Sequence, residues 1–115
     1  MTQTNPFQIE EEVAWEYAAE GISRQIFGFN NEVMMVKVKF EKGAVGSIHQ
    51  HIHTQATYVE SGLFEITIAE EKKVLKAGDG FFVEPNLWHG ALALEAGVLI
   101  DVFNPMRKDF LNQKS

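Results

Sequence analysis

Three of the four histidines in this chain, His49, His51 and His53, fall within the glycine-bounded segment 43–62. Side chains two residues apart point to the same face of a β-strand. A strand through this segment therefore places three imidazoles and the amide of Gln55 on one face. Such a face can hold a metal ion, because neutral imidazole is the commonest protein ligand and suits several transition metals.

The fourth histidine, His89, stands in a second glycine-bounded segment, from which a neighbouring strand could bring it to the same metal. A single histidine on a strand is more often a surface or hydrogen-bonded residue than a ligand. Three that share a face, with the fourth after a separate strand signal, favour metal binding. His53 is the weakest member of the set, since it can equally lie at the rim or orient a ligand through a hydrogen bond.

The rest of the chain shows period-two patterns with turn signals about every ten residues, which predicts an all-β sandwich or barrel. In the segment 33–40, for example, Val36 and Val38 alternate with Lys37 and Lys39. The expected strands are the histidine segment and residues 22–29, 33–40, 57–60, 64–68, 81–83, 91–94 and 98–103, with a turn at Ser61 and Gly62.

Residues 10–20 place Val13, Trp15 and Tyr17 among acids and alanines. This composition predicts a short N-terminal helical turn that ends at Gly21. We interpret Trp15 as a core or interface anchor.

With 115 residues, the chain is long enough for one domain with its own core, and we assign 1–115 to a single domain. The net charge is −6, from 10 basic and 16 acidic side chains, without a basic stripe. Nucleic acids and anionic membranes are therefore poor candidate partners, whereas a small anion can still bind beside one arginine or a metal. The N-terminus is not a signal peptide, no apolar run reaches the length of a membrane span, and the lack of cysteine suits a reducing compartment, so we expect a cytoplasmic protein.

Two glycine-anchored histidine segments separated by a hairpin resemble the cupin superfamily. The first cupin motif is matched at Gly43, His49, His51 and Gly62, with Gln55 in place of its glutamate. The second motif is matched at Gly78, Asp79 and His89, and it departs at Glu84, Asn86 and Ala93. The resemblance covers about residues 30–104 and implies a small cupin jelly-roll barrel with the metal inside.

A closer resemblance, over the whole chain, is to the KdgF-type pectin-degradation cupins. It is carried by the segment 49–55, by the run 85–90 and by the ending 101–107. That family linearises 4,5-unsaturated monouronates from pectin or alginate breakdown to open-chain keto acids. The resemblance implies one divalent transition metal ion (Ni, Zn, Fe, Mn or Cu) bound by His49, His51, Gln55 and His89, and it implies that Asp101, Phe103 and Arg107 contact the substrate or act in catalysis.

Asp101 also stands out on physical grounds, because it interrupts the apolar run 98–103. Burying an acid there is costly unless it is partnered or used. Alternation puts it on the same face as Leu99 and Phe103, which we expect to look into the barrel. The alternative is that Asp101 pairs structurally with Arg24 or Arg107, or points to solvent.

Three functions remain open at this point, of which we favour the enzyme. Asp101 would be the acid–base group, Arg107 would pair with the sugar carboxylate, and Phe103 would pack against the ring. A metal-assisted sugar or organic-acid binding protein without turnover is the second candidate. An oxygenase is the third candidate. The neutral ligand set argues against an oxygenase, because neutral ligands leave the metal its full charge for Lewis-acid work.

Two further expectations concern the surface. The apolar residues Trp15, Met34 and Met35 suggest a homodimer interface. Glu60 and Glu84 are further candidate acids, but Glu60 is more often a solvated charge beside a turn, and Glu84 has only its proximity to His89 in its favour.

Overall fold

The computed structural model describes residues 3–111, in which eight antiparallel strands are accompanied by two short helical segments. The prediction of an all-β fold is confirmed. The elements run in the order η1 (Glu10–Glu12), β1 (Glu16–Ala19), β2 (Ile22–Phe29), β3 (Met34–Phe40), β4 (Val45–His49), β5 (Thr54–Ile68), β6 (Glu71–Lys76), β7 (Gly80–Val83), β8 (His89–Asn104) and α1 (Lys108–Leu111).

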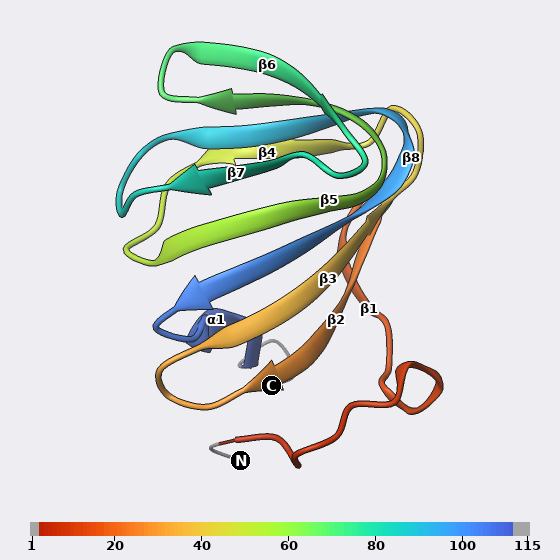
Figure 1. The fold of residues 1–115 in the computed structure, drawn as a ribbon, viewed down its shortest axis with the longest axis vertical. Coiled ribbons are helices and arrows are strands. Elements are labelled where there is room, and N and C mark those ends of the chain that lie inside the picture. Colours follow the sequence, from red (N-terminus) through yellow and green to blue (C-terminus); the bar gives the residue numbers. More distant parts are fainter. Residues whose placement is uncertain (1–2, 112–115) are drawn as a thin grey trace.

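The long strands β5 and β8 pair with each other along most of their length and join the two layers of the fold (Figure 1). The first half of β5 and the second half of β8 lie in one layer with β1, β2, β3 and β7. The other halves lie with β4 and β6 in the second layer. The result is the expected jelly-roll barrel, with an interior between the two layers.

Both long strands bend at glycines that pack against each other. Gly62 has a φ of +92°, and a Cβ atom built on it would lie 2.6 Å from the Cα of Gly97. The register between β5 and β8 shifts beside Gly62, as in a β-bulge. The predicted turn at Ser61 and Gly62 is therefore wrong, as is the predicted separation of 91–94 from 98–103, because the chain bends at these glycines but stays in the sheet.

Gly62→Ala is expected to lower the free energy of unfolding by about 3 kcal/mol, because a steric clash is added to the cost of a left-handed conformation. Gly78→Ala is the matched control. The φ of Gly78 is +96°, but no described atom lies within 4 Å of a Cβ built there, so only the conformational cost remains. Urea unfolding of both variants measures the difference. Equal losses would contradict the role assigned to the Gly62–Gly97 contact.

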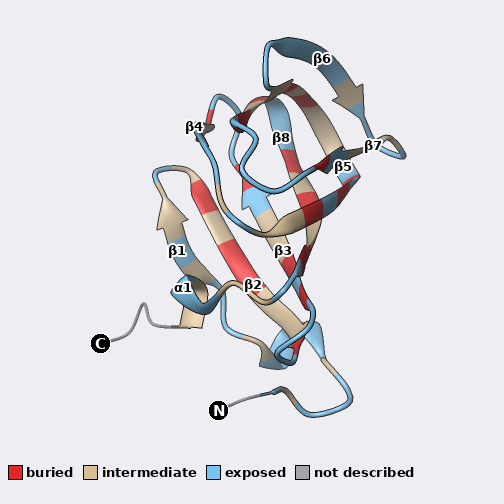
Figure 2. Cartoon of the chain, turned by 90° about the vertical axis from the view of Figure 1, so that its left-hand side faces the viewer, coloured by how far each residue is buried: buried red, intermediate tan, exposed pale blue. Residues whose placement is uncertain are grey.

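Inward-facing residues form rows across the first layer, because the registers of β2, β3, β8 and β5 align them. The rows are Arg24, Val38, Leu99 and Val59; Ile26, Val36, Asp101 and Thr57; and Phe29, Met34, Phe103 and Gln55. Most members are buried, and Figure 2 marks the buried positions along these strands in red. Arg24, Asp101 and Gln55 thus stand as polar residues in a largely apolar wall.

The N-terminal segment agrees with its prediction only in part. A single 3-10 turn forms at Glu10–Glu12, but Glu16–Ala19 is strand β1, which pairs with β2 through a hairpin at Gly21. The φ of Gly21 is +75°, as a tight turn of this kind allows for glycine. Pairing with the edge of the sheet therefore overrides the helical preference of the alanines and glutamates.

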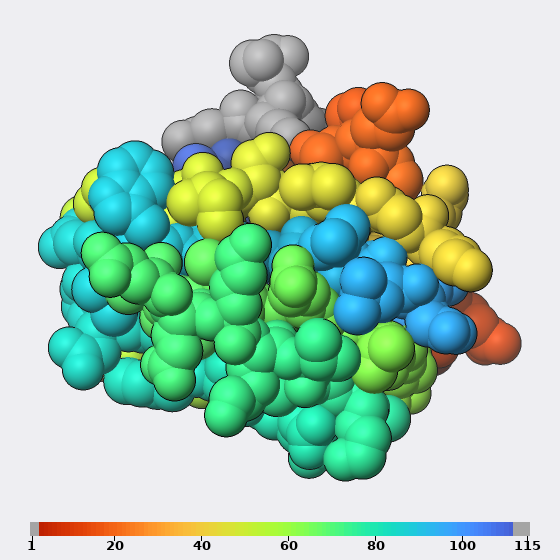
Figure 3. Space-filling view, turned by 90° about the horizontal axis from the view of Figure 1, so that it is seen from above, coloured from red at the N-terminus to blue at the C-terminus, as the bar shows by residue number. Residues whose placement is uncertain are grey.

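The ends of β4, β7 and β8 and the start of β5 all lie at the left-hand edge of Figure 1. Seen from above, β6 covers the top of the barrel, with the segment 44–50 along one edge and the loop before His89 at the side (Figure 3). Within residues 3–111, no helix is long and apolar enough to cross a membrane. The edge where these strand ends meet carries the candidate site.

Candidate metal centre and cavity

The histidine segment is not one continuous strand, contrary to the prediction. Strand β4 ends at His49, which pairs with His89 at the start of β8, and residues 50–53 then cross to the other layer before β5 begins. The strand breaks because β4 and the start of β5 belong to different layers. The loop of residues 50–53 brings His51 next to His49 and His89. A hydrogen bond from the Asn86 N–H to the His51 carbonyl, at 2.7 Å, holds this loop.

Three imidazoles gather at this crossing. The ring centroids of His49 and His89 are 4.4 Å apart, those of His51 and His89 are 4.8 Å apart, and those of His49 and His51 are 5.4 Å apart. Their candidate ligand nitrogens all lie within 4.8 Å of one another. One ion can therefore contact all three rings after small side-chain adjustments.

Backbone carbonyls determine which nitrogen of each ring carries the proton. The Nδ1 atom contacts the carbonyl of Ser47 at 2.8 Å in His49, of His53 at 3.1 Å in His51, and of Leu87 at 2.9 Å in His89. A carbonyl oxygen only accepts, so Nδ1 carries the proton and Nε2 presents a lone pair. Burial, aided by the charge of Arg107, lowers the pKa of His51 to about 4. Burial also lowers the pKa of His89, so both rings are neutral at pH 7.

Gln55 presents its carbonyl oxygen to the same point. Its Oε1 lies 3.0 Å from Nε2 of His51, while its amide nitrogen donates to Thr57 Oγ1 at 2.9 Å and to Asp101 Oδ1 at 3.4 Å. With the proton of His51 on Nδ1, two lone pairs face each other. The Nε2 atom of His89 is buried without a hydrogen-bond partner in the described part of the chain. Three imidazole nitrogens and one amide oxygen thus fit a divalent transition metal ion, which would satisfy all of these atoms.

A cavity of about 260 Å³ opens beside these ligands. This volume suits a molecule the size of one sugar ring. Its apolar wall includes Ile22, Val38, Phe40 and Leu99, and its polar lining residues are Arg24, His49, Gln55, His89, Asp101 and Arg107.

Asp101 lies on the cavity wall, directly across the strand pair from Thr57. The Thr57 hydroxyl donates to Asp101 Oδ1 at 2.7 Å. Burial raises the pKa of Asp101 to about 6, although the hydrogen bond from Thr57 and the charge of Arg107 oppose this rise. A carboxyl group with such a pKa can accept and release a proton near neutral pH. The hydrogen bonds of Asp101 thus run to neutral groups, Thr57 and Gln55, rather than forming the structural arginine pair weighed above.

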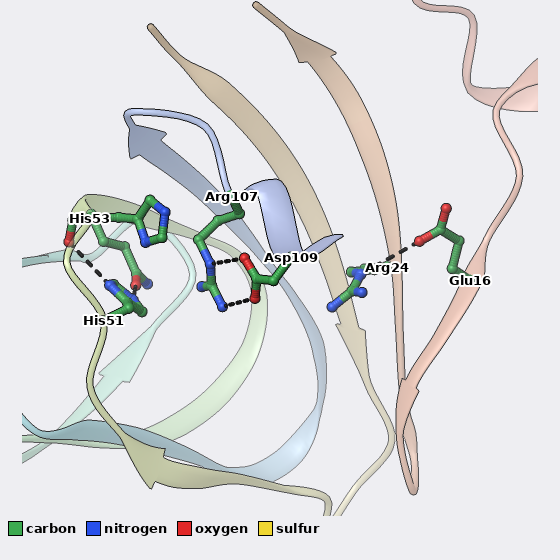
Figure 4. Close-up of polar contacts among 7 residues, drawn as sticks. Glu16, Arg24, His51, His53, Arg107 and Asp109 are labelled. Atoms are coloured by element: carbon green, nitrogen blue, oxygen red, sulfur yellow. Dashed lines mark hydrogen bonds and ion pairs between the residues drawn. The ribbon is translucent and has the colours of Figure 1, made fainter. Parts of the chain in front are cut away.

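Arg107 also lines the cavity, and it is oriented by a residue of the same segment. Its Nε donates to one carboxylate oxygen of Asp109 at 3.0 Å, and its Nη2 donates to the other at 2.7 Å (Figure 4). Its guanidinium carbon lies 5.1 Å from the ring centroid of Phe103 and 4.3 Å from that of Phe110. The two-point contact with Asp109 fixes the plane of the guanidinium.

The remaining predicted residues divide between the cavity and the surface. Phe103 is 2 % exposed and lines the cavity, with its ring centroid 5.7 Å from that of His51. His53 lies outside the group of three candidate ligands, but its carbonyl accepts from His51. Glu60 and Glu84 are both exposed, and neither lines this cavity.

Two polar residues of this region were not recognised from the sequence. Thr57 is one of three threonines on β5, and only the register of β5 with β8 brings it to Asp101. Asp109 follows Arg107 by two residues, a spacing that could have suggested an ion pair.

Comparison with known proteins identifies relatives over nearly the whole chain. A family model described as a cupin domain matches residues 36–103. The pectin degradation protein KdgF of Dickeya dadantii (strain 3937) is 48% identical over 105 residues, which cover 90% of this chain and 96% of that protein.

Solved structures agree with this relationship. KdgF from Halomonas sp. superposes with a TM-score of 0.88 at 42% identity, covering 93% of this chain and 99% of that one. An RmlC-like cupin from Shewanella frigidimarina NCIMB 400 superposes with a TM-score of 0.94 at 45% identity, covering 96% of this chain and 99% of that one. The chain therefore belongs to the cupin family, in the group that contains the pectin degradation protein KdgF.

Proposed function

We propose that this protein linearises 4,5-unsaturated monouronates to open-chain 5-keto-4-deoxyuronates. The observation that carries the proposal is the position of Asp101, a carboxyl group with a raised pKa, in the same small cavity as the candidate metal ligands. The relationship to pectin degradation protein KdgF supports the choice of substrate class.

The chemistry of this reaction needs a mobile proton but no oxidant. Ring opening breaks the bond between C1 and the ring oxygen, converts the C1 hydroxyl to an aldehyde, and leaves an enol at C5. The enol becomes a ketone when its oxygen loses a proton and C4 gains one. One positioned acid–base group together with charge stabilisation is therefore sufficient.

We assign proton transfer to Asp101, with Thr57 holding the carboxylate in place through its hydrogen bond. We assign the sugar carboxylate to Arg107, because a guanidinium pairs well with a carboxylate, and the packing of the sugar ring to Phe103. The proposed metal ligands are His49, His51, Gln55 and His89. A divalent ion bound there would supply Lewis-acid polarisation of substrate oxygens.

The test follows the absorbance of the enol band of an unsaturated monouronate that a lyase has generated. We expect the protein to accelerate the loss of this band over the spontaneous rate. If metal is bound and no acceleration occurs, the enzyme assignment fails for this substrate, and a binding function becomes the better proposal.

We also propose that the chain forms a homodimer through the outer face of the first layer. Met34 is fully buried in the interior and cannot contribute, which corrects that part of the prediction. Met35 is 37 % exposed and stands in a row with Val102, Ala56 and Phe82, of which Phe82 is 58 % exposed. Sedimentation equilibrium is expected to give the mass of two 13.0 kDa chains. A monomer mass at all concentrations would contradict the dimer.

The cytoplasmic location stays a prediction.

A further inference from the structure

Arg24 places a positive charge in a wall that is otherwise largely apolar. It lies on β2, in the same interior row as Val38 and Leu99, and it is only 8 % exposed. It lines the cavity that also contains Asp101 and the candidate metal ligands. A well-packed apolar side chain at such a position is often as stabilising as a buried ion pair, so stability alone is a weak reason for an arginine here.

Arg24 and Arg107 both line the cavity, and each contacts a carboxylate and the ring of Phe110. The Nε atom of Arg24 lies 3.6 Å from a carboxylate oxygen of Glu16. Its guanidinium carbon lies 3.8 Å from the ring centroid of Phe110, which Arg107 also contacts, at 4.3 Å. Figure 4 shows the Arg24 guanidinium between Glu16 on one side and the Arg107–Asp109 pair on the other. The two arginines, from opposite ends of the chain, are thus held against one aromatic ring.

The contact with Asp109 limits what Arg107 can offer to a ligand. A guanidinium binds a carboxylate best through two parallel N–H donors, and Asp109 already occupies the edge formed by Nε and Nη2. A ligand carboxylate has two oxygens, with about four lone-pair positions. A second cation on the same wall can donate to the positions that Arg107 leaves open.

We propose that Arg24 is a second anchor for the carboxylate of the anionic sugar, donating from β2 while Arg107 donates from the segment after β8. Phe110 holds both guanidiniums at the cavity wall, and Glu16 orients Arg24. This inference rests on the proposed uronate function. It makes Arg24 a residue that selects acidic over neutral sugars.

The test compares the binding of galacturonate and galactose by calorimetry, using the metal-loaded protein. Both sugars lack the 4,5 double bond, so binding is measured without turnover. Arg24→Met is expected to raise the Kd for galacturonate by about 10- to 100-fold, the range for a lost hydrogen bond to a charged group, and to leave galactose unchanged. Arg24→Lys keeps the positive charge but loses the planar guanidinium with its paired donors. Its Kd for galacturonate is expected to lie between those of the wild-type protein and Arg24→Met.

Lys72→Met is the matched control, because it removes one positive charge at an exposed site on β6. It is expected to leave both Kd values unchanged. If Arg24→Met folds and binds metal but keeps its galacturonate Kd within about twofold, the proposal is overturned.

If Arg24→Met does not fold, the two Kd values of Arg24→Lys test the proposal instead. Selective weakening of galacturonate supports the anchor, whereas equal weakening of both sugars, or no change, overturns it. The enol assay on the wild-type protein tests the proposed function separately, so the two failures can be distinguished.

Discussion

Replacing Asp101 with asparagine is expected to lower kcat by about 10²- to 10⁴-fold, the usual contribution of a positioned acid–base group. Asparagine has nearly the same shape and can still accept the hydrogen bond from Thr57. It cannot take up and return a proton at neutral pH. The loss should therefore appear in turnover, measured by the enol absorbance.

Folding and metal content are the controls for this variant. Removing a partly desolvated charge is expected to leave the melting temperature unchanged or higher, since a buried carboxylate carries a desolvation cost. Glu60→Gln removes an exposed acid on the same strand as Thr57 and should keep full activity. Near-normal turnover in Asp101→Asn would remove Asp101 from the mechanism.

Loss of the metal site is expected to have an effect of similar size. The double variant His49→Ala, His51→Ala should bind no stoichiometric metal and should lose about 10³-fold or more of the rate acceleration, because a bound metal ion contributes several kcal/mol. Chelation of the wild-type protein should have the same effect, and adding divalent ions one at a time should restore activity. Elemental analysis and the enol assay provide the two readouts.

His53→Ala serves as the matched histidine control. Its ring lies outside the group of three candidate ligands, and its backbone carbonyl, which accepts from His51, is unaffected by the change. It is expected to keep its metal content. If His53→Ala loses metal as completely as the double variant, the ligand set proposed above is wrong.

The strands and their alternation followed from local signals. Period-two patterning and turn residues predicted the strands at 22–29 and 81–83 and the inward face of residues 33–40, because side-chain direction in a strand depends only on the position of a residue along it. The same rule placed Asp101 with Leu99 and Phe103, and all three line one cavity. Alternation failed at residues 50–53 and at Gly62, where the chain passes from one layer to the other.

Residue identity alone determined the histidine-rich site, the all-β class and the candidate acid in an apolar strand. The tertiary structure decided which groups meet: His49 with His89, Thr57 with Asp101, and Arg24 with Arg107 through Phe110. The sequence could not predict these contacts, because they depend on strand register and on the bends of β5 and β8. Both are determined by packing between residues that lie far apart in the chain.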